Sequence, residues 1–388
     1  MSQWPEVPFL EALTDVSARN VKIPKTQYLA TGVLPVIDQG QKVIAGFVDD
    51  PELAHKEPGP LIVFGDHTRI FKFVDFPFAM GADGVKVLRP RSGFDPKFLY
   101  HYLLSAPVPG AGYSRHFKFL KEISVPRPPM DVQQRIAAVL DCVEGLRTKR
   151  REAAALLDEL VSSIVSRTLP RDTETAVLDD VLGRRLRNGI SPSSKGTYEG
   201  KVLTLSALTR GGFDASAWKN GLFESDPIQE HSVKPNVFML VRGNGNKRLV
   251  GGGGFSPVAI PDTAYPDTVL AAPIREDLVV PEYLEVVWKT PIVRRQVEDA
   301  ARTTNGTFKV NQKTMGAVRI PLPGMDWQRE FQQRVRVIRR VRDLHRDHLA
   351  TLDELFASIQ KRAFRGTPSS AIMNPRLRDA SPNQARSA

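Results

Sequence analysis

Cysteine is almost absent from this sequence, since Cys142 is the single one among 388 residues. One cysteine excludes a disulfide within the chain and any cysteine-rich zinc or iron–sulfur site, and it is typical of a reducing compartment. No apolar run approaches the ~18 to 20 residues that a membrane span needs, and the opening MSQWPEVPFLEAL lacks the basic and apolar regions of a signal peptide. We therefore expect a cytoplasmic protein with no membrane partner.

Motifs of the common enzyme classes are also missing. The sequence has no P-loop, no G-x-S-x-G, no H-E-x-x-H and no EF-hand loop. The glycines at Gly251–Gly254 lack the strand, fingerprint and helix order of a dinucleotide site, so they favour a tight loop. The nearest string to the N-P-P-[FY] motif of adenine methyltransferases is NPR at Asn374, and Asp180 with Glu199–Lys201 lacks the apolar strands of a metal-dependent nuclease. His67 follows an aspartate directly, which is poor geometry for a hydrolytic dyad on a strand.

Positive charge, by contrast, is in excess. The chain has 54 Lys and Arg against 43 Asp and Glu, a net charge of +11 and a pI of about 9.7. Such an excess points first to polyanionic partners, of which nucleic acid is the commonest. With 41% apolar and 25% charged residues the chain is typical of globular proteins, and its length predicts two domains.

One long helix pattern occurs twice. The stretches that begin at Met130 and at Met325 align without a gap at an offset of 195 residues, and apolar residues alternate three and four apart along both. At ~1.5 Å per residue each helix would be roughly 55 Å long, which requires a partner running beside it. We interpret the pattern as an internal duplication.

The segment that precedes each long helix mixes short apolar runs with frequent Gly and Pro, which predicts sheets with long loops. A helix is expected at DPKFLYHYLLS, where Asp95 caps, Pro96 takes the first helical position, and Phe98, Leu99 and Leu103 contribute to one apolar face. The second segment repeats this plan with VPEYLEVVWKT. The sequence therefore predicts an α+β protein.

Both segments also place basic and polar residues among glycines in loops. Arg, Lys, Asn, Gln, Ser and Thr are the side chains that reach phosphates and base edges, and Gly lets the backbone approach closely. The alternative is an ordinary set of solvated loops, which the recurrence in both halves disfavours. The predicted DNA-binding residues are His67, Thr68, Arg69, Arg115, His116 and Lys118 in the first half and Lys195, Arg242, Asn244, Lys247, Arg248, Asn305 and Lys309 in the second.

The layout resembles the specificity (S) subunits of type I restriction-modification enzymes. The resemblance rests on WPEVPFLEAL at the start, VPRPPMDVQQRIAAVLD and IPLPGMDWQREFQQRV at the junctions, LLDELVSSIVSRTL and TLDELFASIQKRAF at the helix ends, and GDHTRIFKF with YSRHFKFLK in the first half. It extends over about residues 4 to 365. Each motif is short and degenerate, and it is their repeated order that is specific.

The resemblance implies two target recognition domains with twisted, mostly antiparallel sheets, joined by two long antiparallel helices in a coiled coil with pseudo-twofold symmetry. It implies a non-catalytic chain that binds double-stranded DNA, two methyltransferase (M) subunits and restriction (R) subunits, so that S-adenosylmethionine, ATP and Mg belong to the partners and this chain holds no cofactor. The expected segments are 1–129, first recognition domain; 130–169, first helix; 170–324, second recognition domain; 325–365, second helix; and 366–388, disordered tail. The helix residues assigned to partner docking are Gln133, Asp158, Glu159, Gln328, Asp353 and Glu354.

Two departures from the family pattern concern the helices. Val132 and Trp327 precede the junction glutamines where an acidic residue is more usual, and RVRVIRRVRDLHRD makes the second seam less apolar than the first. Two other functions stay open: the recognition subunit of a related system whose partner fuses nuclease and methyltransferase, and a stand-alone DNA-modifying enzyme.

Overall fold

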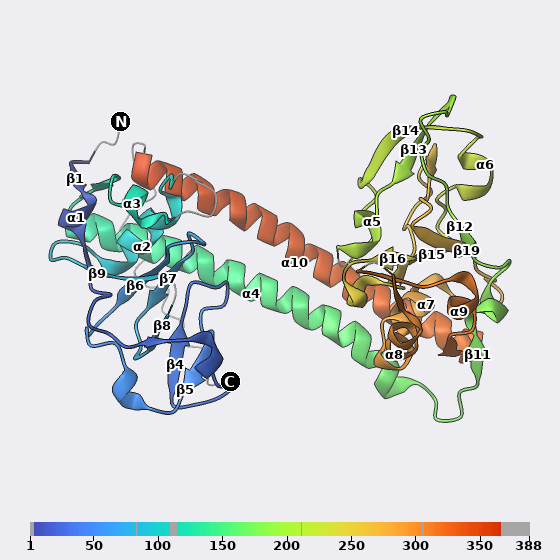
Figure 1. Cartoon of the computed structure of the whole chain (residues 1–388), viewed down its shortest axis with the longest axis horizontal. Helices are drawn as coiled ribbons and strands as arrows, with labels where there is room; N and C mark the ends of the chain where they lie inside the picture. Colours follow the sequence, from blue (N-terminus) through green and yellow to red (C-terminus); the bar gives the residue numbers. More distant parts are fainter. Residues whose placement is uncertain (1–3, 83, 109–114, 211, 305, 366–388) are drawn as a thin grey trace, which may run out of the picture. The chain divides into compact units, whose positions relative to one another are not determined.

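The computed structural model describes residues 4–82, 84–108, 115–210, 212–304 and 306–365. It divides into two compact units, unit 1 with residues 1–150 and 347–388 and unit 2 with residues 151–346 (Figure 1). Both division points lie inside the long helices α4 (Met130–Thr168) and α10 (Met325–Arg365). Each unit therefore contains part of both long helices, which the five predicted segments did not anticipate. The predicted tail lies outside the described residues.

Unit 1 contains two four-stranded sheets, a two-stranded sheet and short helices. The strand orders are β2-β9-β6-β7, β3-β8-β4-β5 and β1-β10. The strands are β1 (Glu6–Pro8), β2 (Leu13–Asp15), β3 (Lys22–Ile23), β4 (Leu34–Ile37), β5 (Gly46–Val48), β6 (Leu61–Gly65), β7 (Phe71–Val74), β8 (Ala79–Gly81), β9 (Val85–Pro90) and β10 (Ser124–Pro126). The short helices are α1 (Phe9–Ala12), η1 (Lys25–Gln27), η2 (Pro51–Leu53), α2 (Pro96–Ser105) and α3 (Phe117–Leu120).

Unit 2 contains the sheets β12-β19-β15-β17, β14-β13-β18, β11-β22 and β16-β21-β20. Its strands are β11 (Thr175–Val177), β12 (Arg187–Asn188), β13 (Tyr198–Leu203), β14 (Trp218–Phe223), β15 (Val237–Val241), β16 (Gly243–Asn244), β17 (Gly253–Gly254), β18 (Thr263–Ala264), β19 (Val269–Pro273), β20 (Arg302–Thr304), β21 (Thr307–Lys309) and β22 (Arg319–Pro321). Its short helices are η3 (Leu178–Val181), α5 (Ser206–Thr209), α6 (Ile228–His231), η4 (Lys247–Leu249), α7 (Pro281–Trp288), α8 (Pro291–Ala300) and α9 (Gln312–Gly316).

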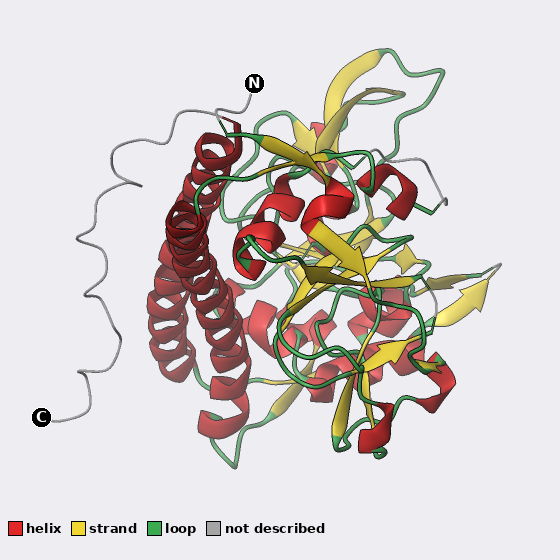
Figure 2. Ribbon diagram, turned by 90° about the vertical axis from the view of Figure 1, so that its left-hand side faces the viewer, coloured by secondary structure: helices red, strands yellow, loops and turns green. Residues whose placement is uncertain are grey.

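The two units share a strand plan. The order β2-β9-β6-β7 corresponds to β12-β19-β15-β17, and β1-β10 corresponds to β11-β22. In unit 1 β4 pairs antiparallel with β5 and parallel with β8, and in unit 2 β13 pairs antiparallel with β14 and parallel with β18. Strands and short helices occur in both units. Figure 2 shows the helices and strands of the whole chain, and this mixture confirms the predicted α+β class.

Helix α2 begins as the sequence predicts. The Asp95 side chain accepts a hydrogen bond from the Phe98 amide at 2.9 Å, and proline occupies the first turn, where its missing N–H costs nothing. The apolar face of α2 packs against both long helices in the core of unit 1, and the rings of Phe98 and Phe364 meet edge to face at 5.5 Å. Periodicity and cap together therefore define this helix.

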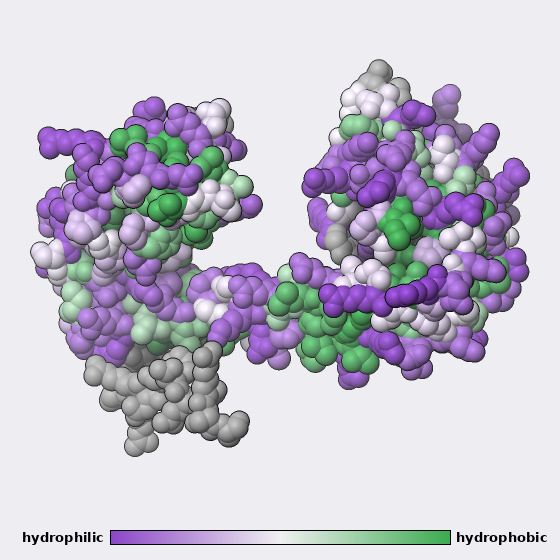
Figure 3. Space-filling view, turned by 90° about the horizontal axis from the view of Figure 1, so that it is seen from below, coloured by the Kyte–Doolittle hydropathy of each residue, from purple (hydrophilic) through white to green (hydrophobic). Residues whose placement is uncertain are grey.

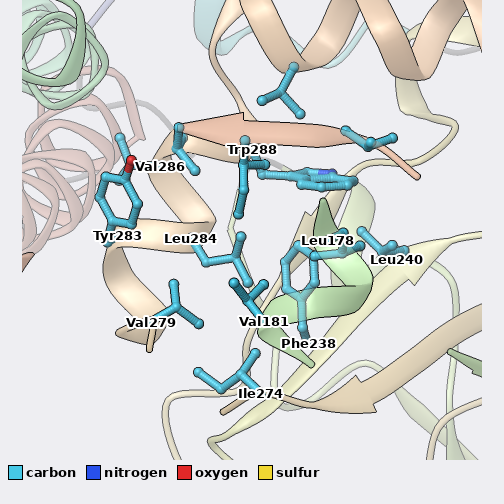
Figure 4. Packing of buried hydrophobic residues seen from close by; sticks show 14 of the residues in the cluster. Leu178, Val181, Phe238, Leu240, Ile274, Val279, Tyr283, Leu284, Val286 and Trp288 are labelled. Carbon is cyan, nitrogen blue, oxygen red and sulfur yellow. The ribbon is translucent and has the colours of Figure 1, made fainter. Parts of the chain in front are cut away.

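The core of unit 2 is built around α7. Tyr283, Leu284 and Trp288 are fully buried. The side chains of Leu284 and Trp288 lie toward residues of η3 and β15 (Figure 4), whereas the Tyr283 ring meets Trp327 and Phe331 of α10. The indole Nε1 of Trp288 donates to the Gly251 carbonyl at 2.7 Å, which satisfies its one polar atom. The glycine run thus packs against the core of its own unit, and a Cβ atom at Gly253 would lie 2.7 Å from the Phe238 ring.

A buried glutamine joins each long helix to the loop before the neighbouring short helix. The Gln133 Oε1 atom accepts from the Asp95 amide at 2.8 Å, and its Nε2 atom donates to the Gly93 and Pro128 carbonyls at 3.0 and 2.9 Å. Gln328 makes the corresponding bonds to the Val280 amide and to the Leu278 and Pro323 carbonyls at 3.0, 2.9 and 2.8 Å. The pattern is therefore repeated in the two units.

The long helices are also linked to one another within each unit by ion pairs. In unit 1 Arg147 contacts Asp353 at 2.6 Å, and in unit 2 Arg342 contacts Asp158 at 3.0 Å. Each helix carries its Asp 11 residues after its Arg. Because an arginine of one helix meets the aspartate of the other in both cases, the same spacing favours antiparallel pairing in both units.

A second set of ion pairs joins the short and long helices, with opposite polarity in the two units. In unit 1 Lys97 and His101 of α2 contact Asp141 of α4, the His101 Nε2 atom at 2.8 Å. In unit 2 Glu282 of α7 contacts Arg336 of α10 at 2.7 Å. The basic residues are thus on the short helix in unit 1 and on the long helix in unit 2.

Asp141 makes the stability of unit 1 dependent on acid pH. Burial alone would raise the pKa of its carboxyl, but hydrogen bonds from His101 and Lys97 outweigh it and leave the pKa below its usual value. A carboxyl whose pKa is lower in the folded than in the unfolded chain stabilises the folded state at every pH above its unfolded pKa of about 4. This contribution is lost as the pH falls further, through the folded pKa. We expect Asp141→Asn to unfold more readily than wild type at neutral pH, with the gap shrinking below about pH 4.

The free energy of unfolding of the full chain, measured in denaturant from neutral to acid pH, checks this expectation. The exposed carboxylate of Asp172 provides a control, because Asp172→Asn makes the same charge change away from α2 and α4. A difference between wild type and Asp141→Asn that is constant across the pH range would contradict the assignment.

Candidate nucleic-acid interface

Two loops meet at one edge of unit 1. The turn between β6 and β7 contains the buried Asp66, and the segment before α3 folds against it. The His116 amide donates to the Asp66 carbonyl at 2.9 Å, and the Phe117 amide donates to the Asp66 carboxylate at 2.7 Å. We call residues 66–70 and 115–118 the first loop pair.

The first loop pair brings most of the predicted DNA-binding residues of this half together. Thr68, Arg69, Arg115 and Lys118 are exposed, and His67 is half-buried. Arg69 adopts a φ of 60°, a left-handed conformation that is uncommon for a residue with a side chain. The Thr68 hydroxyl donates to the Gln39 carbonyl at 2.7 Å, which fixes the turn from a third segment. The result is an ordered turn that presents basic side chains to solvent.

His116, predicted to contact DNA, is buried. It is 2% exposed, and its ring Nδ1 atom lies 2.9 Å from the Asp66 carbonyl oxygen. A side chain so placed cannot reach a DNA base or phosphate. The prediction that His116 contacts DNA is therefore wrong for this conformation, and its role is to hold the two segments of the first loop pair together.

Unit 2 has a corresponding arrangement. Arg242 directly follows β15 as Asp66 directly follows β6, and the Val310 amide, shortly before α9, donates to the Arg242 carbonyl at 2.9 Å. Strand β16 pairs with β21, and β21 pairs with β20, so a small sheet forms at this place. We call residues 242–248 and 302–310 the second loop pair.

The second loop pair collects five predicted residues. Lys247, Arg248 and Lys309 are exposed, whereas Arg242 and Asn244 are half-buried. The Asn244 side chain accepts from the Asn246 amide at 2.8 Å, and the Asn246 side chain accepts from the Arg248 amide at 3.0 Å. These consecutive turns order the loop that carries the basic side chains. Of the other predicted residues, Lys195 lies in the loop before β13, and Asn305 lies outside the described residues.

The sequence prediction missed Arg302, although it named Asn305 and Lys309 close by. Arg302 is exposed and stands opposite Lys309 across β20 and β21. Like charges directly opposite one another destabilise a sheet, so the pair is favourable where an anion lies over it. Pairing of the two strands was the signal needed, and it cannot be read from one short segment.

The predicted docking residues divide into three kinds. Gln133 and Gln328 are 1% and 0% exposed and use their amide groups within their own units, so their assignment to partner docking is wrong for the side chains. Asp158 and Asp353 are exposed but make the interhelical ion pairs. Glu159 and Glu354 are exposed on the same helices. The docking assignment of the four acidic residues stays a prediction.

Exposed apolar side chains on the long helices are a further feature that the sequence prediction missed. Within unit 2, Leu156 and Leu160 lie one turn apart on α4, and Val337, Val341 and Leu344 follow one face of α10. Figure 3 shows apolar surface gathered over the helices beside the globular part of this unit. Contiguous exposed apolar surface of this kind marks interaction sites. We call these five residues the helix patch.

The described part of the chain shows neither a cluster of metal ligands nor a membrane-spanning helix. There, no three His, Cys, Asp or Glu side chains cluster closely enough to hold a metal ion. None of the described helices combines the length and apolar character that crossing a bilayer requires.

Comparison with known proteins gives a consistent picture. Residues 6–155 match the family described as the Type I restriction modification DNA specificity domain. The type I restriction enzyme EcoKI specificity subunit of Escherichia coli (strain K12) is 24% identical over 313 residues, 72% of this chain and 67% of that protein. A type I restriction-modification S subunit from M. genitalium has a TM-score of 0.55 at 14% identity, with 94% of this chain and 96% of that chain covered. A chain from a structure of type I R-M complex assembly and conformational transition has a TM-score of 0.50 at 16% identity over 94% and 98%.

Proposed function

We propose that this chain, which resembles type I specificity subunits and carries their DNA specificity domain at residues 6–155, reads a split DNA target for a type I restriction-modification complex. Each unit would recognise one half of the target through its loop pair. Lys and Arg would neutralise phosphates and supply affinity without sequence preference, and a few loop side chains would contact bases.

The observation that carries the proposal is the equivalence of the two loop pairs. Both follow the third strand of the four-stranded sheet, both are tied to the segment before a short helix by a hydrogen bond from a backbone amide to the carbonyl of the residue after that strand, and both expose basic side chains. A protein that reads two half-sites needs the same surface twice. The two pairs differ in sequence, and the sheet β16-β21-β20 is found in unit 2, so the two half-sites should differ as well.

Two methyltransferase subunits and restriction subunits are the proposed protein partners. The antiparallel pairing of the long helices within each unit supports a coiled coil with pseudo-twofold symmetry, which would offer related faces to two methyltransferase subunits. The helix patch, with Glu159 and Glu354 on the same helices, is the proposed docking surface. Catalysis, S-adenosylmethionine, ATP and Mg would then belong to the partners, and this chain would hold no cofactor.

A related system remains the second candidate, because the partner could fuse nuclease and methyltransferase in one chain. A neighbouring gene with an NPPF-like motif supports either recognition-subunit function, and a separate helicase-type gene favours the type I complex. A stand-alone DNA-modifying enzyme is disfavoured by the missing catalytic motifs.

Methylome sequencing with and without the gene tests the proposed function. We expect N6-methyladenine to disappear from one split, non-palindromic motif when the gene is deleted and to return when it is restored. An unchanged methylome in a strain that expresses the neighbouring methyltransferase would refute the proposal.

The long helices should set the distance between the half-sites, because both run through the two units. We expect that adding about seven residues, two helical turns, to both helices lengthens the spacer of the methylated motif by about three base pairs. The insertion points are the unit boundaries between Arg150 and Arg151 and between Arg346 and Asp347, which leave the packing inside each unit intact. A motif that keeps its spacer would contradict this role.

A further inference from the structure

Strands β13 and β14 form an antiparallel ribbon whose two faces have different surroundings. On its other side β13 pairs with β18 at Lys201 and Val202, so β14 is the edge strand of this sheet. Six residue pairs join the strands, from Tyr198 opposite Phe223 to Leu203 opposite Trp218. The corresponding pair in unit 1, β4 with β5, has three residue pairs. The ribbon is therefore longer in unit 2, and Figure 1 shows it extending away from the α10 part of the same unit.

One face of the ribbon is closed by prolines. Gly200 and Gly221 stand opposite each other in the middle of the ribbon. A Cβ atom at Gly221 would lie 2.5 Å from the Pro192 ring, and a Cβ atom at Gly200 would lie 2.9 Å from the Pro227 ring. The two glycines therefore make room for prolines that pack on this face, and Phe223 beside them is fully buried.

The opposite face is open except at one end. Because side chains alternate along a strand and opposite partners share a face, Lys201 pairs with Asn220 on it and Leu203 pairs with Trp218. Leu203 is buried in the core of unit 2, so the face is closed at that end. Asn220 and Trp218 are exposed, and the Trp218 ring has the Lys201 ammonium 4.4 Å from its centre. Glu199 and Leu222, the last pair on this face, are exposed too. We call this surface the ribbon face.

The ribbon face has the shape and chemistry of a base-reading element. A two-stranded ribbon fits the major groove of B-DNA. The ribbon is two-stranded from Tyr198 to Gly200, before β18 pairs with β13, and β14 is an edge strand throughout. Asn binds adenine through two hydrogen bonds, apolar groups contact the thymine methyl, and a lysine neutralises phosphate. The ribbon face presents all three kinds of group, and Lys195 lies in the loop whose Ser193 amide donates to the Leu222 carbonyl at 2.8 Å. A structural role alone would not require Trp218, Asn220 and Leu222 to be exposed together.

We infer that the ribbon face enters the major groove and reads an A·T base pair of the second half-site through Asn220. Trp218 and Leu222, each about 7 Å along the strand on either side of Asn220, would lie over base pairs on the two sides of it, where an apolar group favours a thymine methyl. The inference rests on the proposed function and extends it, because it adds a base-reading element to unit 2, while most phosphate contacts of this unit stay with the second loop pair and Lys201 adds one. Glu199 at the other end of the ribbon face would accept a hydrogen bond from cytosine rather than approach a phosphate.

Methylome sequencing of strains with single substitutions tests the inference. We expect Asn220→Ala to relax one position of one half-site by about ten- to a hundredfold in discrimination and to leave the other half-site unchanged. Asn220→Asp should change the preferred base at the same position, because a carboxylate accepts from cytosine but cannot donate to adenine. A changed preference cannot arise from unfolding, so this variant keeps the inference testable if Asn220→Ala proves unstable.

Two lysines give a matched pair of controls for charge. Lys201 lies on the ribbon face, and Lys219 lies exposed on the opposite face of β14, next along the strand from Asn220. We expect Lys201→Ala to weaken DNA binding of the assembled complex and to lower its salt dependence by about one contact, with little effect from Lys219→Ala.

The outcomes separate the inference from the function it rests on. A wild-type strain whose methylome does not depend on the gene contradicts the proposed function. A split motif that depends on the gene and stays unchanged in Asn220→Ala, Asn220→Asp and Trp218→Ala overturns the ribbon inference alone. Loss of complex assembly by these variants, with base preference unchanged in the complex that forms, would identify the ribbon face as a protein contact and would overturn it too.

Discussion

Replacing Lys247, Arg248 and Lys309 together with alanine is expected to weaken DNA binding of the assembled complex by roughly two to three orders of magnitude at about 0.1 M salt. All three side chains are exposed in the second loop pair. Each phosphate contact contributes about 0.9 to the slope of log affinity against log salt, so three lost contacts remove about 2.7 logarithmic units relative to 1 M salt. Affinity for the methylated motif, measured by fluorescence anisotropy across a salt series, gives both the loss and the slope.

A control with the same change in net charge distinguishes local contacts from long-range attraction. Arg171, Arg185 and Arg275 are exposed residues of unit 2 outside the second loop pair. Their triple alanine variant should keep the wild-type slope and lose little affinity. Equal losses in the two variants would mean that the loop pair has no special role.

The second large effect is expected from the buried glutamines. Gln133→Met keeps a side chain of similar length but removes three hydrogen bonds, which leaves the Asp95 amide and two carbonyls without their partner. Stranding buried polar groups costs about 1 to 3 kcal/mol each where water cannot replace the partner, so with three such groups we expect unit 1 to lose at least about 3 kcal/mol. Gln328→Met should destabilise unit 2 by a similar amount.

Calorimetry of the full chain, with hydrogen exchange to assign each effect to α2 or α7, measures these losses. Gln134 is the control, because it follows Gln133 directly and is exposed. Gln134→Met should change the melting temperature little. Wild-type melting of both Gln133→Met and Gln328→Met would show that the hydrogen bonds contribute nothing net to stability.

Several features of the fold could be predicted because their causes are local. The cap at Asp95 and the proline after it define the start of α2, and the repeated spacing of apolar residues defines α4 and α10. The basic loop segments could also be selected, because glycine and basic residues gather in the same short stretches of sequence, although their pairing could not. In these cases neighbouring residues carry the whole signal.

Other features depend on residues far apart in the chain. Gln133 is a polar helix residue near a helix start, and its burial follows from a loop 38 to 40 residues earlier. His116 is buried by a carbonyl 50 residues earlier. The ribbon face follows from prolines that pack on two paired glycines. None of these partners can be identified from the local pattern, which is why polarity was taken as exposure for both Gln133 and His116.

The reversed ion pairs restrict how the two halves can exchange sequence by recombination. Asp95 and Val280 occupy the same place relative to the buried glutamines, so Lys97 corresponds to Glu282 and Asp141 corresponds to Arg336. A segment ending before the long helix, moved from the first position to the second, would bring Lys97 against Arg336. In that place Lys97 of the transplanted segment would face the positive charge of Arg336, whereas in its original place it faces the negative charge of Asp141. New combinations of half-sites are therefore better tolerated when the crossover lies beyond Asp141 or Arg336, so that each short helix travels with the residue that matches it.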